Sequence, residues 1–392
     1  MTTRTEGGTG DDILINVTPR ETRVAVVENG VLQEILIERA GKRGLVGNIY
    51  QGRVCRVLPG MEAAFVDIGL ERAAFLHVSD IRPETPPDVD ETNSDRTEPV
   101  ITDLVREGQE LVVQVIKDPI GTKGARLTTH ITLPSRFLVF LADADMAGVS
   151  VKIDGERERQ RLKETVNAFR AELGGGYIVR TAAEGAEPEA LRADMQFLQR
   201  LWQSIRERIS QTSGIGVLYE DLPLVLRVLR DFVGDSVEKV RIDSRETCQR
   251  MLQFADQFVP DMAPRLEHYP GERPIFELYG IEDEIQRALG KKVPLKSGGY
   301  LVVDQTEAMT TIDVNTGAYV GHRNLEETIF KTNLEASAAI ARQLRLRNLG
   351  GIIILDFIDM LSEEHRQAVL KSLEKHLEKD RARSHISQVS PL

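Results

Sequence analysis

A run of apolar residues that ends in a carboxylate constrains the fold of this chain most strongly. The run Gly350–Leu355 has no polar side chain, and Asp356 follows it directly. Such a run, begun by glycine and ended by a charge, is typical of a buried strand in a parallel sheet. Helical patterns at Leu325–Arg347 and Glu363–Arg381 predict a β-α-β-α order around it. Because ligands bind at the carboxyl ends of such strands, Asp356 is a candidate site residue.

A second candidate carboxylate lies on an earlier strand pattern. Alternation within Thr311–Asn315 places Asp313 and Asn315 on the face opposite Ile312 and Val314. If the two strands are neighbours, two aspartates and an amide converge in an oxygen-rich site suited to Mg²⁺. Asp359, three residues after Asp356, is an alternative ligand. The other interpretation is that each acid caps a helix or pairs with an arginine, and spacing alone does not decide.

The N-terminal third is predicted to be β structure. Ile13–Val17 and Arg23–Glu28 alternate apolar and polar residues, and Asn29–Gly30 suits a tight turn before the next strand, Val31–Glu38. The short β-branched stretches of Asn48–Val78, followed by Gln109–Lys117, indicate a small barrel.

Three residues of this barrel are candidates for stacking and holding single-stranded bases. Phe65 and Phe75 flank Gly69, and Lys123 lies in a glycine loop. Filling of the barrel core by both phenylalanines is the alternative. The intervening segment Arg82–Pro99 is rich in Pro, Asp, Glu and Thr, and we expect a flexible loop there.

An α/β segment is predicted after Pro134. Glu156–Glu172 and Pro188–Thr212 have helical spacing, and Tyr177–Thr181 reads as a strand. At the end of that strand, Arg180 and Thr181 are candidates for a phosphate-binding site. The alternative is that Arg180 is a solvent-exposed surface residue without a ligand, which is the more frequent case for an arginine at a strand end. Leu224–Ser244 has β-like patterning and is expected to pair with the N-terminal hairpin.

Composition narrows the class of protein. Fifty Lys and Arg against 61 Asp and Glu give a net charge of −11, which argues against coating of nucleic acid through bulk positive charge. Two distant cysteines, Cys55 and Cys248, make neither a disulfide framework nor a CxxC zinc site. No apolar run suits a signal peptide or a membrane span, so a cytoplasmic location is expected.

Longer motifs resemble the catalytic region of the ribonuclease E/G family. They are Thr311–Asn315 (TIDVN), Asn333–Ala336 (NLEA), Ile340–Arg347 (IARQLRLR) and Leu349–Met360 (LGGIIILDFIDM). Glu62–Asp67, Arg106–Gln109 and Ile178–Thr181 are also similar to that family, so the resemblance extends from Ile13 to Arg383. The chain looks most like the ribonuclease G branch.

The resemblance implies an α/β and α+β multidomain architecture. It implies an RNase H-like domain formed by residues 1–46 and 225–288, with an inserted S1 RNA-binding barrel (OB-type) at 47–129 and a 5′-sensor domain at 130–224, and then a DNase I-like catalytic domain at 289–392. It implies that Asp313, Asp356 and Asn315 are catalytic, that the two aspartates bind Mg²⁺, that Phe65, Phe75 and Lys123 bind RNA, and that Arg180, Thr181, Val139 and Arg383 sense a 5′-monophosphate.

Two departures from the family pattern affect these expectations. Val151–Lys152 stands where the family usually has two arginines, which predicts weaker contacts to a 5′ phosphate. The sequence given also lacks the family's CPxC motif, so we expect zinc only in a longer chain, together with a homodimer or larger assembly.

The implied function is Mg²⁺-dependent endonucleolytic cleavage of single-stranded RNA to 5′-phosphate and 3′-hydroxyl products, in rRNA processing and mRNA decay, with stimulation by a 5′-monophosphate. The alternatives are a non-catalytic S1-type RNA-binding protein, a fragment inactive without further sequence, and a DNA-directed nuclease. Cleavage-site preference and any role of the acidic segment at residues 80–103 stay open.

Overall fold

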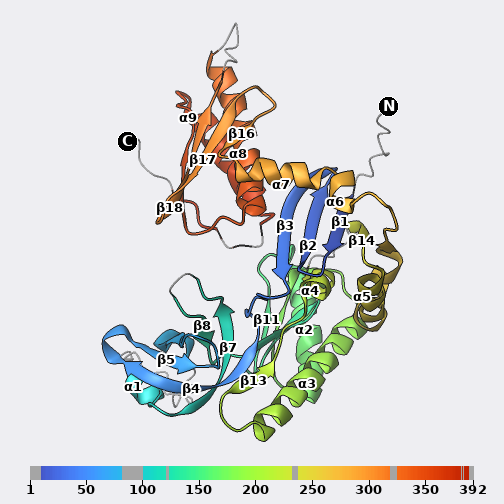
Figure 1. The fold of residues 1–392 in the computed structure, drawn as a ribbon, viewed down its shortest axis with the longest axis vertical. Helices are drawn as coiled ribbons and strands as arrows, with labels where there is room; N and C mark the ends of the chain where they lie inside the picture. Colours follow the sequence, from blue (N-terminus) through green and yellow to red (C-terminus); the bar gives the residue numbers. More distant parts are fainter. Residues whose placement is uncertain are drawn as a thin grey trace. The chain divides into compact units, whose positions relative to one another are not determined.

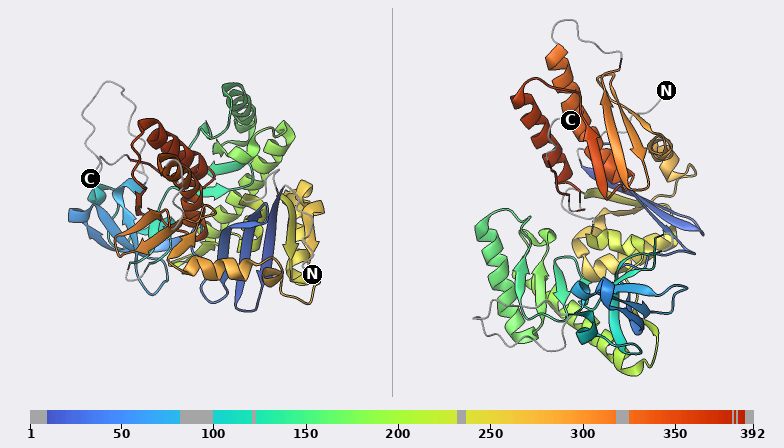
Figure 2. Two further views of the ribbon diagram at one scale, coloured as in Figure 1. Left: turned by 90° about the horizontal axis from the view of Figure 1, so that it is seen from above. Right: turned by 90° about the vertical axis from the view of Figure 1, so that its left-hand side faces the viewer.

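The computed structural model describes residues 10–81, 100–120, 123–231, 237–317, 325–380, 382 and 384–387. The chain forms two compact units, drawn as ribbons in Figures 1 and 2. Unit 1 comprises Met1–Gly41 and Asp235–Leu392, and unit 2 comprises Lys42–Gly234. The segment expected to be a flexible loop, Arg82–Pro99, lies outside the described residues.

The first sheet of unit 1 has five strands in the order β15-β14-β1-β2-β3. Asn29 and Gly30 take φ values of 51° and 74°, as a tight turn between β2 and β3 requires, so the predicted hairpin is confirmed. β14 pairs with β1 in parallel, which confirms the expected pairing with the hairpin. The strands are β1 (Asp11–Val17), β2 (Glu21–Glu28), β3 (Val31–Arg39), β14 (Val237–Ile242) and β15 (Leu266–His268).

The second sheet of unit 1 has the order β16-β17-β18-β19, and α8 and α9 cover one of its faces (Figure 2, right). Ile312 and Val314 are buried against these helices, whereas Asp313 between them is exposed, as alternation predicts. Ser362 caps α9, since its side chain accepts the backbone N–H of His365. The elements are β16 (Lys292–Pro294), β17 (Tyr300–Gln305), β18 (Met309–Asn315), α8 (Leu325–Leu346), β19 (Ile352–Asp356) and α9 (Glu363–Leu377).

Two predictions for this sheet were wrong. The predicted β-α-β-α order is present as β18-α8-β19-α9, with β18 and β19 parallel, but the rest of the sheet is antiparallel and not part of a parallel core. The short turn from Thr306 to Met309 forces β17 and β18 to run antiparallel. The strand before Asp356 is not buried on both faces either. β19 is an edge strand, and the side chains of Ile352 and Ile354 on its outer face are 63% and 47% exposed.

The C-terminal part of α8 joins the two sheets of unit 1. Leu346 packs in one core with Leu14 and Ala25 of the first sheet. Arg342 donates from Nε to the carbonyl of Leu32 on β3 at 2.8 Å. The remaining helices of unit 1 are α5 (Arg245–Phe258), η4 (Pro260–Arg265), α6 (Ile275–Leu278) and α7 (Ile281–Leu289).

Unit 2 contains a closed five-stranded barrel, which confirms the small barrel inferred from the strand pattern. Its strands run β4-β5-β6-β8-β7, β7 closes back onto β4, and β13 extends the sheet beside β4. They are β4 (Ile49–Leu58), β5 (Ala63–Asp67), β6 (Ala74–His77), β7 (Glu110–Lys117), β8 (Arg126–Thr128) and β13 (Gly216–Tyr219), with η1 (Pro59–Met61), η2 (Val78–Asp80) and α1 (Ile101–Leu104) in their connections.

The second part of unit 2 is a four-stranded sheet, in the order β11-β12-β10-β9, that packs with α2 and α3. The two long helices and β12 confirm the predicted α/β segment. The elements are β9 (Thr132–Pro134), β10 (Leu138–Leu141), β11 (Ala147–Val149), α2 (Glu156–Leu173), β12 (Gly176–Val179), η3 (Thr181–Ala183) and α3 (Pro188–Gln211).

One further prediction for unit 2 was wrong. The start of the segment expected to be β-like is a helix, α4 (Leu224–Asp231). Leu224, Val225, Val228 and Leu229 are all buried, and this i, i+4 spacing is that of one helical face.

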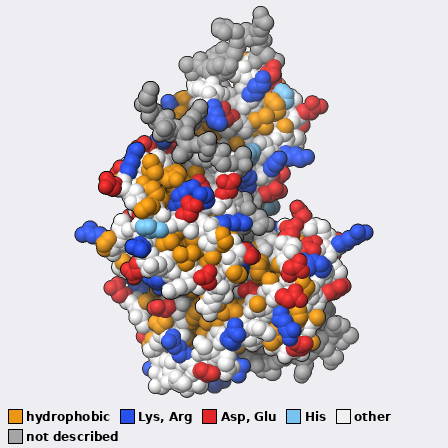
Figure 3. All heavy atoms as spheres, turned by 90° about the vertical axis from the view of Figure 1, so that its right-hand side faces the viewer, with side chains coloured by type: hydrophobic (Ala, Val, Ile, Leu, Met, Phe, Trp, Pro, Cys, Tyr) orange, Lys and Arg blue, Asp and Glu red, His pale blue; other side chains and the backbone are white. Residues whose placement is uncertain are grey.

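On the face drawn in Figure 3, cationic and anionic side chains are interspersed. Within the described ranges, no helix is both long enough and apolar enough to cross a lipid bilayer.

Candidate functional site

The structure brings the two predicted aspartates together. β18 and β19 run parallel, and Asp313 is the register partner of Asp356. Directly paired residues of neighbouring strands project to the same face, so both carboxylates lie on the outer side of the second sheet, away from α8 and α9. Both residues are exposed. The carboxylates therefore meet at the carboxyl ends of two adjacent strands, open to solvent.

Asn315 completes this cluster. It lies two residues after Asp313 on the same face, and its Nδ2 donates to Asp313 Oδ2 at 2.8 Å. In the part of the chain that the structure describes, no cationic side chain forms an ion pair with Asp313 or Asp356, and no group of three or more His, Cys, Asp or Glu side chains could hold a metal ion. Two carboxylates without cationic partners fit Mg²⁺, which retains several waters and commonly uses only one or two protein carboxylates.

The loop after β19 is fastened to α8. Asn333, fully buried, donates from Nδ2 to the carbonyl of Ile358 at 2.8 Å and accepts the Ile358 N–H at 3.2 Å. Further along, Glu326 accepts the backbone N–H of Ser362 at 3.2 Å, and this hydrogen bond is the main reason that the pKa of Glu326 is lowered. The segment that follows Asp356 is thus held at two points.

The arginines of α8 do not face the aspartates. Arg342 binds Glu284 at 2.5 Å, and Arg345 lies 3.3 Å from Glu28 of the first sheet. These two arginines instead join the two sheets of unit 1.

The barrel phenylalanines are neighbours on its surface. Phe65 and Phe75 are register partners on β5 and β6, with ring centroids 6.1 Å apart at 69°. Both are half-buried, and neither belongs to the cluster that fills the barrel core. Lys123 is exposed and forms a backbone bridge with Ile120, and Ala125, two residues on, accepts the N–H of Phe75 at 2.7 Å. All three candidates therefore lie near one another.

A third ring beside them was missed. The centroid of His77 is 6.3 Å from that of Phe75. The Nδ1 atom of His77 accepts the backbone N–H of Ser79 at 3.2 Å, so this hydrogen bond does not use Nε2. Alternation along β6 was a signal that could have identified it, because Phe75 and His77 are two residues apart on one face.

The predicted phosphate-sensing residues surround the end of β12. Val139 is the register partner of Ile178, two residues before Arg180, and Thr181 is exposed at the start of η3. Val151–Lys152 follows β11 in a turn, with the Val151 side chain 88% exposed. Arg383 lies outside the described residues.

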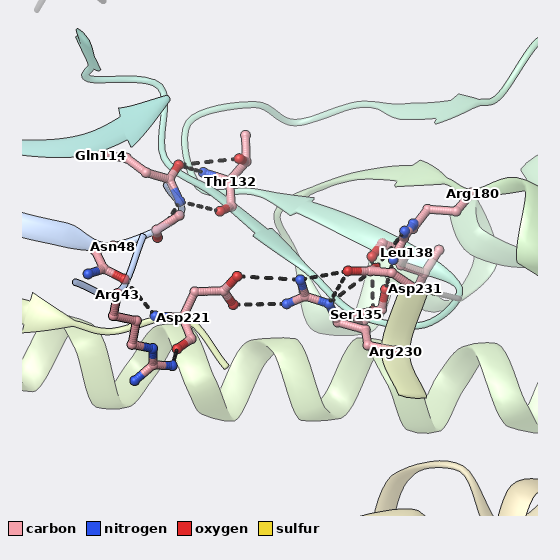
Figure 4. A network of polar contacts seen from close by, with 11 residues as sticks. Arg43, Asn48, Gln114, Thr132, Ser135, Leu138, Arg180, Asp221, Arg230 and Asp231 are labelled. Atoms are coloured by element: carbon pink, nitrogen blue, oxygen red, sulfur yellow. Dashed lines mark hydrogen bonds and ion pairs between the residues drawn. The ribbon is translucent and has the colours of Figure 1, made fainter. Parts of the chain in front are cut away.

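Arg180 is already bound within the protein. Figure 4 shows its guanidinium between the Ser135 carbonyl and the Asp231 carboxylate, the latter at 2.8 Å. No local pattern pointed to Asp231, which lies 51 positions from Arg180 in the sequence and at the end of the helix that was predicted as a strand.

Unit 1 also contains a cavity of about 380 Å³ between β3, β16 and α8. Its lining includes Glu28, Lys296, Glu335 and Arg345 but neither Asp313 nor Asp356. The cavity is therefore separate from the carboxylate pair.

The chain is similar to known ribonucleases and to an RNA-binding domain. The model of the Ribonuclease E/G family matches residues 132–392, and that of the S1 RNA binding domain matches residues 45–128. Ribonuclease G of Salmonella typhimurium is 58% identical over 381 residues, covering 97% of this chain and 78% of that protein. Ribonuclease G of Haemophilus influenzae is 57% identical over 382 residues, covering 97% and 77%. Ribonuclease E of Escherichia coli is 39% identical over 385 residues, covering 96% of this chain and 36% of the relative.

Proposed function

The chain belongs to the ribonuclease E/G family, and from this premise we propose that it is a Mg²⁺-dependent endoribonuclease that cleaves single-stranded RNA at the Asp313–Asp356 pair. Its similarity to Ribonuclease G and Ribonuclease E indicates an endoribonuclease of RNA processing, and its S1 domain indicates RNA binding. The observation that carries the proposed site is the register pairing of two exposed aspartates at the ends of parallel strands.

Each residue of the pair has a defined part in this proposal. Asp313 and Asp356 would hold Mg²⁺, which when bound polarises a phosphoryl oxygen and lowers the pKa of a bound water. Asn315 orients the Asp313 carboxylate through its 2.8 Å hydrogen bond. The fastened loop after β19 keeps Asp356 at its register position opposite Asp313. Preorganised ligands of this kind lower the barrier because they need no rearrangement during the reaction.

The barrel supplies the grip on RNA. Phe65 and Phe75 offer partly exposed ring faces and edges on which bases stack, and Lys123 adds a cation for the backbone. The products proposed are 5′-phosphate and 3′-hydroxyl ends, and the roles proposed are rRNA processing and mRNA decay.

We further propose stimulation by a 5′-monophosphate bound at Arg180, Thr181 and Val139, with Arg383 as an additional contact. The exposed hydroxyl of Thr181 and the guanidinium of Arg180 support this assignment, since both donate hydrogen bonds to phosphate oxygens. Of Val151 and Lys152, only the lysine is a cation, so we propose that this site binds a 5′ phosphate more weakly than a site with two arginines.

The finer architecture is also a proposal. The strand order β15-β14-β1-β2-β3, with β1 parallel to β14, supports an RNase H-like domain, and the α8–α9 layer on the second sheet supports a DNase I-like domain. The four domain ranges predicted above stay a prediction, as do a cytoplasmic location, a homodimer or larger assembly, and zinc in a longer chain.

Cleavage assays with and without metal test the site. We expect discrete internal cleavage of a 5′-monophosphorylated, A/U-rich single-stranded RNA by the wild type in Mg²⁺, and none in EDTA. The double variant Asp313→Asn/Asp356→Asn should lose at least about 100-fold in rate, because removal of transition-state charge stabilisation costs this much in other enzymes.

Asp304→Asn is the matched control. Asp304 lies on the neighbouring strand β17, opposite Thr311, and forms an ion pair with Lys291 at 2.5 Å. This variant should cleave at nearly the wild-type rate. Full cleavage by the double variant would disprove the two-aspartate site, and RNA bound but uncut by the wild type would favour the binding-protein alternative. The matching DNA, which lacks the 2′-hydroxyl, should be left intact.

A further inference from the structure

Asp231 forms an ion pair with the guanidinium of Arg180, the same group that the proposed phosphate-binding site requires. Arg180 Nη2 lies 2.8 Å from Asp231 Oδ1, and Arg180 Nη1 donates to the Ser135 carbonyl (Figure 4). The side chains of Arg180 and Asp231 are 26% and 20% exposed, so incoming phosphate has access to the pair but meets it already formed. An anion that binds Arg180 must therefore replace a carboxylate.

Asp231 is held in place by a second arginine. Arg230, whose side chain is 9% exposed, binds Asp231 Oδ2 and Asp221 Oδ1 from its two terminal nitrogens at 2.9 Å each. Burial alone would raise the pKa of Asp231, but hydrogen bonding and attraction from Arg230, then from Arg180, outweigh it and lower that pKa. Asp231 is thus a carboxylate at neutral pH.

The contacts of Arg230 with Asp231 and Asp221 also lower the free-energy cost of separating Arg180 from Asp231. When Arg180 turns to another anion, Asp231 keeps its contact with Arg230, and Arg230 keeps both carboxylates. No buried charge is left without a partner, which is the usual large penalty for breaking such a pair. Arg180 meanwhile keeps its position through the Ser135 carbonyl.

We propose that Asp231 is a specificity-determining residue that competes with the RNA 5′ end for Arg180. A 5′-monophosphate, a divalent anion with three acceptor oxygens, displaces the singly charged carboxylate, whereas a 5′-hydroxyl end offers no anion and leaves the Arg180–Asp231 pair closed. This inference rests on the proposed role of Arg180 in sensing the 5′ phosphate.

The test compares one RNA sequence with a 5′-monophosphate and with a 5′-hydroxyl, and its readout is the ratio of their kcat/KM values. Asp231→Asn removes the competing charge while preserving shape, and we expect the ratio to rise about fivefold, equivalent to about 1 kcal/mol for a partly exposed ion pair. The rise should come from a lower KM for the phosphorylated RNA. Affinity for a 5′-phosphorylated trinucleotide, measured by fluorescence anisotropy, should increase to a similar extent.

Asp221→Asn is the matched control. It removes the other carboxylate of Arg230 but no contact of Arg180, so the ratio should stay at the wild-type value. Asp231→Ser serves as a second variant, with the same expected rise, if the asparagine variant does not fold, as judged by its thermal unfolding midpoint.

Three outcomes would overturn the inference. An unchanged ratio in folded Asp231→Asn would show that Asp231 does not compete, and a lower ratio would show that it positions Arg180 for phosphate instead. An equal rise in Asp221→Asn would mean that general loosening of the network is responsible. The variant Arg180→Gln distinguishes failure of the Asp231 inference from failure of the proposed function. If Arg180→Gln keeps the preference for 5′-monophosphorylated RNA, the proposed sensing role of Arg180 is itself wrong.

Discussion

At the scale of single residues, the candidate active site depends on one buried amide. Asn333 on α8 has no exposed surface, and both of its polar atoms bind the backbone of Ile358, two residues after Asp356. A side chain of another length would leave the Ile358 N–H and carbonyl without these partners. Unsatisfied buried polar groups cost more than the hydrogen bond itself contributes, so this position tolerates little change.

We predict that Asn333→Ala lowers the free energy of unfolding by about 2–4 kcal/mol, since two hydrogen bonds to the backbone are lost and a small cavity is created. Denaturant titration followed by circular dichroism measures this change. Gln367→Ala removes an exposed amide bound to Glu363 on α9 and should change the same quantity by less than about 0.5 kcal/mol. Equal effects of the two substitutions would contradict a stabilising role of the hydrogen bonds between Asn333 and Ile358.

The sequence predicted residues whose placement depends on local periodicity. Asp313 and Asn315 share a face because strands alternate, and Asp356 follows an apolar run that pairs with theirs. The Arg180–Asp231 pair was not predictable, because it joins a strand end to a helix 51 positions away. Contacts of that kind are set by tertiary packing and leave no periodic trace in the sequence.

At the scale of whole elements, two of the three errors in the β predictions arose where hydrophobicity alone was decisive. Leu224–Asp231 is as apolar as a strand but turns its buried residues to one helical face. Gly350–Leu355 looked like a central strand, yet two of its three isoleucines, Ile352 and Ile354, face solvent on the side of Asp356. Short apolar runs do not distinguish between these cases. The long helices α2 and α3 were predicted well because many turns repeat the same pattern.

The start of α2 should stabilise unit 2 in a pH-dependent way. The Arg161 hydrogen bond, followed by the Gly185 backbone N–H, lowers the pKa of Glu158 from 4.5 to about 2. A lowered carboxyl pKa adds stability above pH 4.5, and this is lost as the pH falls towards 2. Glu158→Gln should therefore lower the free energy of unfolding at pH 6 by no more than about 1 kcal/mol, because Arg161 is partly exposed to solvent.

Thermal unfolding of wild type and Glu158→Gln from pH 6 to pH 2 tests this prediction. The difference between their midpoints should shrink steadily with acidification. Glu164→Gln is the control, because Glu164 is on the same helix and accepts a hydrogen bond from Gln160, and among the described residues it forms no ion pair. A similar pH dependence in this variant would argue against a special role of Glu158.

At the scale of the whole molecule, the chain is nested. Unit 2 is one continuous stretch, Lys42–Gly234, whereas unit 1 is made of two stretches on either side of it. β1 lies in the middle of its sheet, between β14 from the second stretch and β2 from the first. The first stretch therefore supplies three of the five strands of this sheet, including the central one.

We predict that the fragment 42–234 folds by itself, because it holds a closed barrel and a second core of its own. The fragment 235–392 should not fold fully alone, since β14 would lose β1, and Leu346 would lose Leu14 and Ala25. Amide dispersion in NMR spectra of the two fragments measures this. Addition of a peptide covering residues 1–41 should increase the dispersion of 235–392, and a well-dispersed spectrum of 235–392 alone would contradict the nested arrangement.

The position of β1 has a consequence for synthesis on the ribosome. The hairpin that contains β1 emerges early, but its parallel partner β14 is not made until all of Lys42–Gly234 has been translated. At a translation rate of about 5–20 residues per second, the edge of β1 that pairs with β14 stays unpaired for roughly 10–40 s. The nascent chain is exposed to wrong strand pairing for that time, so slower elongation or the absence of a holding chaperone should lower the yield of this enzyme more than that of a protein whose sheets form from consecutive segments.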